Sequence, residues 1–166
     1  MKRTFYLMFA AVMTITACQT KTKIVPIDTA AAKVDVTTVL DKYTSAMKAK
    51  DANTLMTLLT ENGLYCGTDS RELLDKAGLS NMMNQSFADT SLKVNYSVDK
   101  REIRIATDGN SAIAVEQMFF KAFSQKMPIR MVYHIVKNND NWLFDFVSWN
   151  FIPNNEDLGK LNKALE

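Results

Sequence analysis

The sequence predicts an α+β domain, with helices in the N-terminal half of the chain and an antiparallel sheet in the C-terminal half. Apolar residues recur at helical spacing between residues 36 and 87, and they alternate at strand spacing between residues 92 and 152. The phase of that alternation flips near residues 99–100, and a slip of one residue exchanges the two faces of a strand. We therefore expect a bulge there and a bent sheet.

The first helix is predicted from an apolar stripe at spacings of three and four residues, which comprises Val36, Val39, Leu40, Tyr43 and Met47. Asp35 is placed to cap its start. Asp51 is expected to cap a short second helix that Asn62–Gly63 ends, and Leu64–Gly67 then forms a brief extended segment. Ser70 is expected to cap a third helix. Its apolar side carries Met82, Met83 and Phe87.

The strands begin with the alternating residues Leu92, Val94, Tyr96 and Val98, followed in the opposite phase by Ile103 and Ile105. Asp108–Gly109 predicts a tight turn. The next strand is expected from Ser111 to Ser124. A short C-terminal helix is predicted from the spacing of Leu158, Leu161 and Leu165.

Residues 129–152 form the clearest element, a β-hairpin in which two aromatic and β-branched runs flank the polar residues 138–141. With a four-residue loop, Lys137 lies opposite Trp142. One face, almost wholly apolar, then carries Met131, Tyr133, Ile135, Phe144, Phe146 and Ser148. The other face carries Arg130, Val132, His134, Val136, Leu143, Asp145, Val147 and Trp149. We expect the first face to form the core or a pocket.

The N-terminus has the organisation of an export signal. A positive Met1–Arg3 precedes the apolar residues 5–13, a run too short to span a bilayer. Ile15-Thr16-Ala17-Cys18 resembles the lipobox of bacterial lipoproteins, and this resemblance implies cleavage before Cys18 and lipidation of that cysteine. The alternative is an ordinary secretory leader with a chance cysteine. We favour the lipoprotein because only two cysteines occur and one lies at this position.

These features divide the chain into a signal peptide over residues 1–17, a lipidated Cys18 with a polar tether over residues 18–32, and a domain over residues 33–166. The expected location is the bacterial cell envelope, on the periplasmic side or at the surface, with the membrane reached through Cys18. Gln19, rather than Asp, follows the cysteine, so no inner-membrane retention signal is evident. Cys66 would remain as the one cysteine of the domain, where a small buried hydrophobe is the ordinary role.

Composition argues against several classes of function. The formal net charge is +2, and loss of Lys2 and Arg3 with the leader brings it to about zero. No basic stripe is present, which argues against nucleic-acid binding. The chain holds one histidine, His134, too few converging ligands for a zinc or copper site, and its five glycines form no phosphate loop. We expect no metal and no cofactor.

Two stretches carry a resemblance to a known superfamily. Residues 39–51 together with 55–65 resemble the opening of nuclear transport factor 2-like domains, a superfamily that includes ketosteroid isomerase, scytalone dehydratase and SnoaL-like polyketide cyclases. Residues 65–69 and 142–148 are similar to segments of SnoaL-like domains. The resemblance covers about residues 34–152. It implies a cone-shaped, cystatin-like α+β fold with three N-terminal helices in the concavity of a strongly bent antiparallel sheet, and a pocket at the open end.

The isomerase resemblance can be followed residue by residue. Tyr43 falls on the tyrosine that donates to the oxyanion in that enzyme, but the position of its catalytic base falls on Gly67, which cannot accept a proton. The strand over residues 129–137 holds no carboxylate, and Ser148 stands where many SnoaL-like domains have histidine. Asp69 is the carboxylate expected nearest the pocket mouth, although it also fits a helix cap.

Three functions therefore stay open. The first is a non-catalytic, lipid-anchored pocket that binds a small, largely apolar ligand, lined by Tyr43, Tyr65, Met83, Tyr133, Phe146 and Ser148. The second is a cofactor-free isomerase, dehydratase or cyclase that uses Asp69 and Tyr43. The third is a protein-interaction module. His134 and Asp145 are expected to form a simple cross-strand pair, because their face points away from the concavity.

The second face of the hairpin is too apolar to be left in water by a monomer. The resemblance implies that such domains pair through this convex surface. We therefore expect a homodimer in which Arg130 stacks on Trp149. The expected contact residues are Val132, Val136, Leu143, Val147, Trp149 and Phe151. The alternative is that the C-terminal helix covers this surface.

Overall fold

The structure is a computed structural model that describes residues 28–124 and 126–166. The expected signal peptide, Cys18 and most of the expected tether lie outside these residues. Within the described residues, no helix combines the length and the apolar character needed to cross a bilayer.

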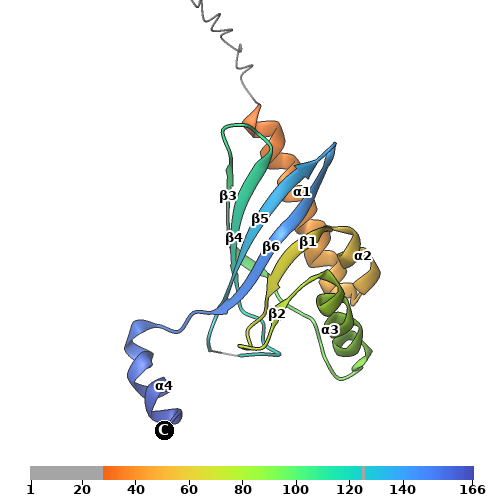
Figure 1. The fold of residues 1–166 in the computed structure, drawn as a ribbon. Coiled ribbons are helices and arrows are strands. Elements are labelled where there is room, and N and C mark those ends of the chain that lie inside the picture. The colour runs from red at the N-terminus through yellow and green to blue at the C-terminus, as the bar shows by residue number, and fades with distance from the viewer. Residues whose placement is uncertain (1–27, 125) are drawn as a thin grey trace, which may run out of the picture.

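Three helices, α1, α2 and α3, pack against one side of a curved six-stranded sheet whose strand order is β2-β1-β6-β5-β4-β3 (Figure 1). Neighbouring strands are antiparallel except β1 and β6, which run parallel. The expected α+β fold, with three helices in the concavity of a bent sheet, is confirmed. The strands are β1 (Leu59–Cys66), β2 (Leu73–Leu74), β3 (Val98–Ile105), β4 (Ser111–Met118), β5 (Ile129–Asn138) and β6 (Asn141–Phe151).

Helix α1 (Thr29–Ala49) begins earlier than expected, so the last residues of the predicted tether are helical. Asp28 caps it, accepting hydrogen bonds from the backbone N–H groups of Ala30 and Ala31, each at 3.0 Å. The alanine run that follows suits a helix, which is why the start precedes Asp35. The predicted stripe is confirmed, since its buried residues are Val36, Val39, Leu40, Tyr43, Ala46 and Met47.

The segment after α1 departs from the sequence prediction. Asp51 caps α2 (Ala52–Thr57) as expected, but Gly63 lies inside β1 rather than ending a helix. A Cβ atom on Gly63 would approach the carbonyl oxygen of Asp145 to 2.9 Å, so glycine allows β1 to lie close against β6. The expected cap at Ser70 is also wrong: residues 66–74 form the β1–β2 hairpin, and Asp75 caps α3 (Lys76–Ala88).

The bend in the sheet lies where the sequence predicted it, because the β3–β4 register shifts between Val98 and Lys100. The Asp108–Gly109 turn is confirmed, with Gly109 at φ 68°. Strand β4 ends at Met118, earlier than expected, and the segment that follows folds back toward the concavity. The C-terminal helix α4 (Leu158–Ala164), preceded by a turn of 3₁₀-helix (η1, Asn155–Asp157), stands away from the sheet (Figure 1).

The β5–β6 hairpin contains a bulge that the sequence did not predict. Lys137 pairs with Trp142 and Ile135 with Phe144, as expected, but His134 pairs with Phe146. Asp145 is the extra residue, so every pair beyond it is shifted by one. Tyr133 lies opposite Val147, instead of Phe146, and Met131 opposite Trp149, instead of Ser148.

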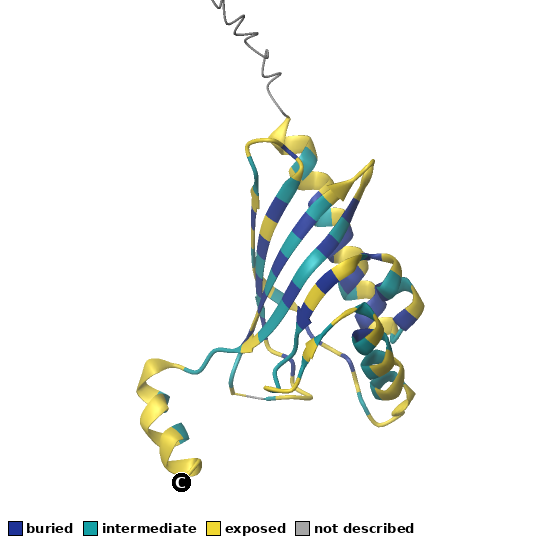
Figure 2. Cartoon of the chain, in the orientation of Figure 1, coloured by how far each residue is buried: buried dark blue, intermediate teal, exposed yellow. Residues whose placement is uncertain are grey.

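The bulge exchanges the faces of the second half of β6. Val147 is buried in the concavity, and the side chains of Trp149 and Phe151 pack on the core from the same side. Phe146 and Ser148 are only partly buried and share the convex face with His134 and Val132, their partners on β5. Figure 2 shows the resulting alternation of buried and less buried positions along the strands. The expected convex placement of Val147, Trp149 and Phe151 is therefore wrong.

The bulge gives Phe144 and Phe146, the phenylalanines on either side of it, different energetic roles. Phe144 is fully buried and packs edge-on against Tyr43, with ring centroids 5.1 Å apart, so Phe144→Ala should lower the free energy of unfolding by about 3–5 kcal/mol. Phe146→Ala removes a partly buried ring and should cost only about 1–2 kcal/mol. Urea denaturation of both variants measures the difference. Equal losses would contradict the observed register.

Candidate functional site

A cavity of about 320 Å³ opens at one end of the concavity, between the end of α1, the β1–β2 hairpin, α3 and the segment after β4. This size suits a small organic molecule. Most of its walls are apolar. The lining residues are Tyr43, Met47, Tyr65, Cys66, Gly67, Thr68, Glu72, Leu74, Leu79, Met82, Met83, Ser86, Phe87, Asp89, Leu92, Val94, Phe120, Phe123, Val147 and Trp149.

One wall is a cluster of three aromatic rings. Phe120 and Phe123 lie 4.7 Å apart between ring centroids, and each lies 6.4 Å from Trp149. Phe120 is buried, whereas Phe123 is half exposed at the rim. Methionines 47, 82 and 83 contribute flexible, polarisable side chains to the lining. A cavity with such walls can adapt to an apolar ligand of irregular shape.

Tyr43 lines the cavity from α1 and is fixed by neighbouring rings. Its ring packs edge-on against Tyr133 and Phe144, with centroids 5.9 and 5.1 Å away. Burial raises the pKa of the Tyr43 phenol well above its ordinary value, and the nearby Tyr96 adds to the shift. The hydroxyl therefore stays neutral over the whole physiological pH range and can donate or accept a hydrogen bond.

Tyr65 contributes a ring to the cavity, while its hydroxyl is already engaged. That hydroxyl donates to the backbone carbonyl oxygen of Phe144 at 3.3 Å, across the junction of β1 with β6. Burial again raises the pKa of the phenol, and the negative charge of Asp145 adds to the shift. The Tyr65 ring thus lines the cavity, and its hydroxyl links β1 to β6 beside the bulge.

The β1–β2 hairpin places one carboxylate, Glu72, at the cavity. The backbone N–H of Gly67 donates to the carbonyl oxygen of Glu72 at 2.9 Å, and the Glu72 side chain lies across Gly67, where any Cβ atom would overlap its carboxylate. The Oε2 atom of Glu72 accepts a hydrogen bond from the backbone N–H of Asp69 at 3.1 Å. Gly67 is needed here for space, which explains a glycine at the position where the isomerase resemblance would place a base.

Asp69 itself does not line the cavity. Its carboxylate accepts three hydrogen bonds from Arg71, from the backbone N–H at 2.9 Å and from the guanidinium at 2.9 and 2.8 Å. These hydrogen bonds hold the pKa of the Asp69 carboxyl well below its ordinary value. A carboxylate so engaged is a poor proton acceptor, and it neither faces Tyr43 across the cavity nor caps α3.

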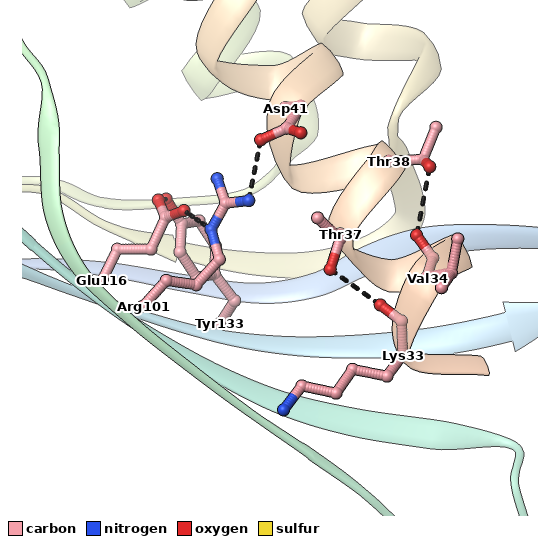
Figure 3. Close-up of polar contacts among 8 residues, drawn as sticks. All are labelled: Lys33, Val34, Thr37, Thr38, Asp41, Arg101, Glu116 and Tyr133. Atoms are coloured by element: carbon pink, nitrogen blue, oxygen red, sulfur yellow. Dashed lines mark hydrogen bonds and ion pairs between the residues drawn. The ribbon is translucent and has the colours of Figure 1, made fainter. Parts of the chain in front are cut away.

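Behind the cavity, a chain of polar side chains, buried at its Glu116–Tyr133 end, joins α1 to three strands (Figure 3). Glu116 of β4 is 0 % exposed, and its Oε2 accepts from the Tyr133 hydroxyl at 2.8 Å. Its Oε1 accepts from Nε of Arg101 at 2.6 Å, while the same guanidinium reaches the Asp41 carboxylate at 2.7 Å. Burial and the adjacent Glu116 charge raise the pKa of Tyr133 well above its ordinary value. These groups do not line the cavity.

Three of the six predicted pocket residues, Tyr43, Tyr65 and Met83, line the cavity. Tyr133 is fully buried behind Tyr43, and the bulge turns Phe146 and Ser148 away to the convex face. The same shift brings in Val147 and Trp149, which the sequence placed outside. The sequence does not predict Phe120 and Phe123 in the cavity because alternation continues β4 through them, nor Glu72 because a helix capped at Ser70 would include it.

His134 and Asp145 pair on the convex face, as expected, with Nδ1 and Oδ2 3.1 Å apart. Thr60 also donates to this carboxylate, at 3.2 Å. Neither member of the pair lines the cavity. Among the described residues, no group of three or more metal-binding side chains converges.

Comparison with known proteins agrees with this geometry. A family model described as a SnoaL-like domain matches residues 36–145, well over half of the chain. The chain belongs to the SnoaL-like family. The match runs from the first buried residue of α1 to the bulge in β6, so it contains most of the cavity wall but ends before Trp149.

Solved structures similar to this SnoaL-like protein show the same fold. A nuclear transport factor 2-like protein of unknown function from Pseudomonas putida has a TM-score of 0.65 at 10 % identity, covering 76 % of this chain and 91 % of that one. A Pectobacterium atrosepticum protein of unknown function has a TM-score of 0.64 at 17 % identity, with 75 % and 93 % covered.

A Nostoc punctiforme protein with a cystatin-like fold and unknown function has a TM-score of 0.59 at 9 % identity, with 73 % and 91 % covered. The search among curated proteins gave no match to the SnoaL-like chain. At such low identities the similarity establishes the fold alone.

Proposed function

We propose that this SnoaL-like protein is a binding protein of the bacterial cell envelope that holds a small, largely apolar ligand in the cavity without transforming it. The observation that carries the proposal is the cavity itself, whose walls are mostly aromatic, methionine and aliphatic side chains with a few polar ones among them. Tyr43 lines the cavity and its hydroxyl stays neutral, so it can orient a ligand by donating or accepting a hydrogen bond.

The enzymatic alternative is weaker because its expected base is missing from the cavity. Asp69 is held outside by Arg71. An isomerase, dehydratase or cyclase would have to use Glu72, the carboxylate of the hairpin, in place of Asp69. Glu72 already supports that hairpin through the Asp69 N–H, a role that favours binding over proton transfer. The third alternative, a protein-interaction module, concerns the convex face and is compatible with a ligand in the cavity.

Binding is testable with N-phenyl-1-naphthylamine, a neutral dye that fluoresces in apolar surroundings. The chain from residue 19 onward, which contains the whole described fold, should bind the dye with saturation at one site. Ser86→Trp places an indole in the cavity from α3 and should weaken binding at least about fivefold.

The matched control is Gln85→Trp, which adds the same side chain at an exposed neighbouring position of α3 and should leave dye binding unchanged. Absence of saturable binding by the unmodified chain would overturn the proposal. Equal weakening by both tryptophans would instead assign the dye to the surface of the helix.

We also propose attachment to the membrane through a lipidated Cys18, supported by the lipobox-like sequence before it. Cys18→Ala should abolish labelling by a fatty-acid analogue and release the protein from membranes, because the anchor is covalent. Cys66→Ala is the control, and it should keep both the fatty-acid labelling and the membrane attachment. Persistent labelling of Cys18→Ala in its bacterial host would refute the anchor.

A homodimer through the convex face is a further proposal, with a changed set of residues. Helix α4 does not cover that face (Figure 1), where Leu64 and Ile113 are 43 % and 45 % exposed. Their apolar neighbours on the same face are Val115, Val132, Val136, Leu143 and Phe146. Arg130 shares this face but contacts Gln117, and it cannot stack on Trp149 as expected because that ring lies in the concavity. A patch of this size favours burial against a second copy.

Phe146→Glu should convert the dimer into a folded monomer, because a two-fold axis brings each new charge toward its copy. Light scattering at tens of micromolar measures the mass, and circular dichroism confirms folding. Asn81→Glu, on the exposed side of α3, should leave the dimer intact. A monomeric unmodified chain would sink the proposal.

A further inference from the structure

The charged side chains that line the cavity are of one sign. Glu72 and Asp89 are carboxylates, and no Lys, Arg or His is among the described lining residues. The rest of the lining includes six aromatic rings, those of Tyr43, Tyr65, Phe87, Phe120, Phe123 and Trp149. The two tyrosines keep neutral hydroxyls, so they add no positive charge and no phenolate near neutral pH.

The two carboxylates differ in what they already bind. Asp89 accepts hydrogen bonds from the backbone N–H and the hydroxyl of Ser91, at 2.8 and 2.7 Å. The ammonium group of Lys50 donates a hydrogen bond to the backbone carbonyl oxygen of Asp89. The Ser91 hydrogen bonds, with a smaller contribution from the Lys50 charge, lower the pKa of the Asp89 carboxyl. These contacts already stabilise the negative charge of Asp89, which lies at an exposed position.

Glu72 is the less engaged of the two carboxylates. Its Oε2 accepts one backbone hydrogen bond from Asp69, and within residues 28–124 and 126–166 it forms no ion pair. The adjacent Arg71 forms its ion pair with Asp69 and feels the Glu72 charge more weakly, without a contact to it. The carboxylate is partly shielded from solvent by its position over Gly67. A negative charge so placed, at the edge of an apolar cavity, favours a cation nearby.

An anionic ligand would meet the opposite situation. A carboxylate or sulfate entering the cavity would lose water, find no basic side chain, and lie near the Glu72 charge. A protonated amine would gain the attraction of Glu72 and could also place its cationic end against the faces of aromatic rings, which carry negative electrostatic potential. A neutral ligand would be neither repelled nor attracted by the Glu72 charge, so its affinity should lie between those of the anion and the amine.

We infer that the cavity selects a small organic cation, an amine whose ammonium group lies beside Glu72 and whose aryl or alkyl body packs against Phe120, Phe123 and Trp149. This inference rests on the proposed ligand-binding function and adds the charge of the ligand to it. It assigns Glu72 as the residue that determines this selectivity, while the aromatic cluster supplies affinity that is independent of charge.

Three probes that share one skeleton test the inference: 4-phenylbutylamine, 4-phenylbutanol and 4-phenylbutyrate, which are cationic, neutral and anionic at pH 7. Calorimetric titration into the chain from residue 19 onward should give the tightest binding for the amine and the weakest for the acid. We expect the dissociation constants of these two to differ by about tenfold or more at low salt. The preference should shrink as salt is added.

Glu72→Gln removes the charge and keeps an oxygen that accepts the Asp69 N–H. It should weaken amine binding about fivefold and leave phenylbutanol binding within about twofold. Glu61→Gln is the matched control: it removes an equal charge from an exposed β1 residue that pairs with Lys76 outside the cavity, and it should change neither affinity.

The outcomes separate the two proposals. If phenylbutanol binds but the amine has no advantage over the acid, or if Glu72→Gln leaves amine binding unchanged, the charge inference is overturned and the binding function stands. If none of the three probes and no neutral dye binds, the binding function fails and the inference fails with it. A preference for the amine that both Glu72→Gln and Glu61→Gln reduce equally would assign it to the overall charge, which also overturns the role of Glu72.

Discussion

The bulge at Asp145 is the constraint on which the rest of the structure depends. It inserts one residue into β6 opposite β5, and therefore decides which side chains of the last strand enter the concavity. The bulged position is held from three directions, by His134 on β5, by Thr60 on β1 and by the close approach of Gly63. The polar contacts keep the carboxylate on the convex side, where water can reach it. Without this shift, Trp149 would point outward and the aromatic wall of the cavity would lose a ring.

A second interaction holds the helical layer on the sheet. The chain from Asp41 through Arg101 and Glu116 to Tyr133 joins α1 to β3, β4 and β5 (Figure 3). Burying the Glu116 carboxylate is unfavourable by itself, and both of its oxygens are accordingly satisfied by charged or hydroxyl donors. The network lies directly behind Tyr43, whose ring packs on Tyr133. These packed rings hold Tyr43 in one position, so the inner wall of the cavity keeps its shape.

The sequence predicted most of the fold because its periodic signals are strong. The stripe of α1, the phase change near Lys100 and the Asp108–Gly109 turn each reflect a local rule, and the structure follows all three. The errors have a different origin. Alternation alone cannot locate a bulge inside an apolar run, because residues 142–149 are acceptable on either face. Glu72 was assigned to a helix because Ser70 resembles a cap, whereas pairing of β2 with β1, a tertiary interaction, decides the matter.

The candidate site was harder to predict than the fold for the same reason. Residues such as Tyr43 and Met83, on helices with a clear apolar side, could be placed in the concavity from spacing alone. Those on β6 depended on the register, and Phe120 and Phe123 on where β4 stops. No local pattern indicates that Arg71 pairs with Asp69 rather than with Glu72, since this choice arises from the turn that the hairpin makes.

The parallel pairing of β1 with β6 has a consequence for how the chain reaches this structure. Thr60 and Asp145, which meet at the bulge, are 85 residues apart in the sequence, so the first strand finds its neighbour only when the last has been made. Until then β1 has just the two-residue β2 beside it, and its other edge is open. Contacts this distant in sequence form late and slowly. A nascent chain must therefore carry β1 with one edge unpaired while the residues between these contacts are made, and the polar Glu61-Asn62 in the middle of β1 helps to keep that strand from pairing with another chain.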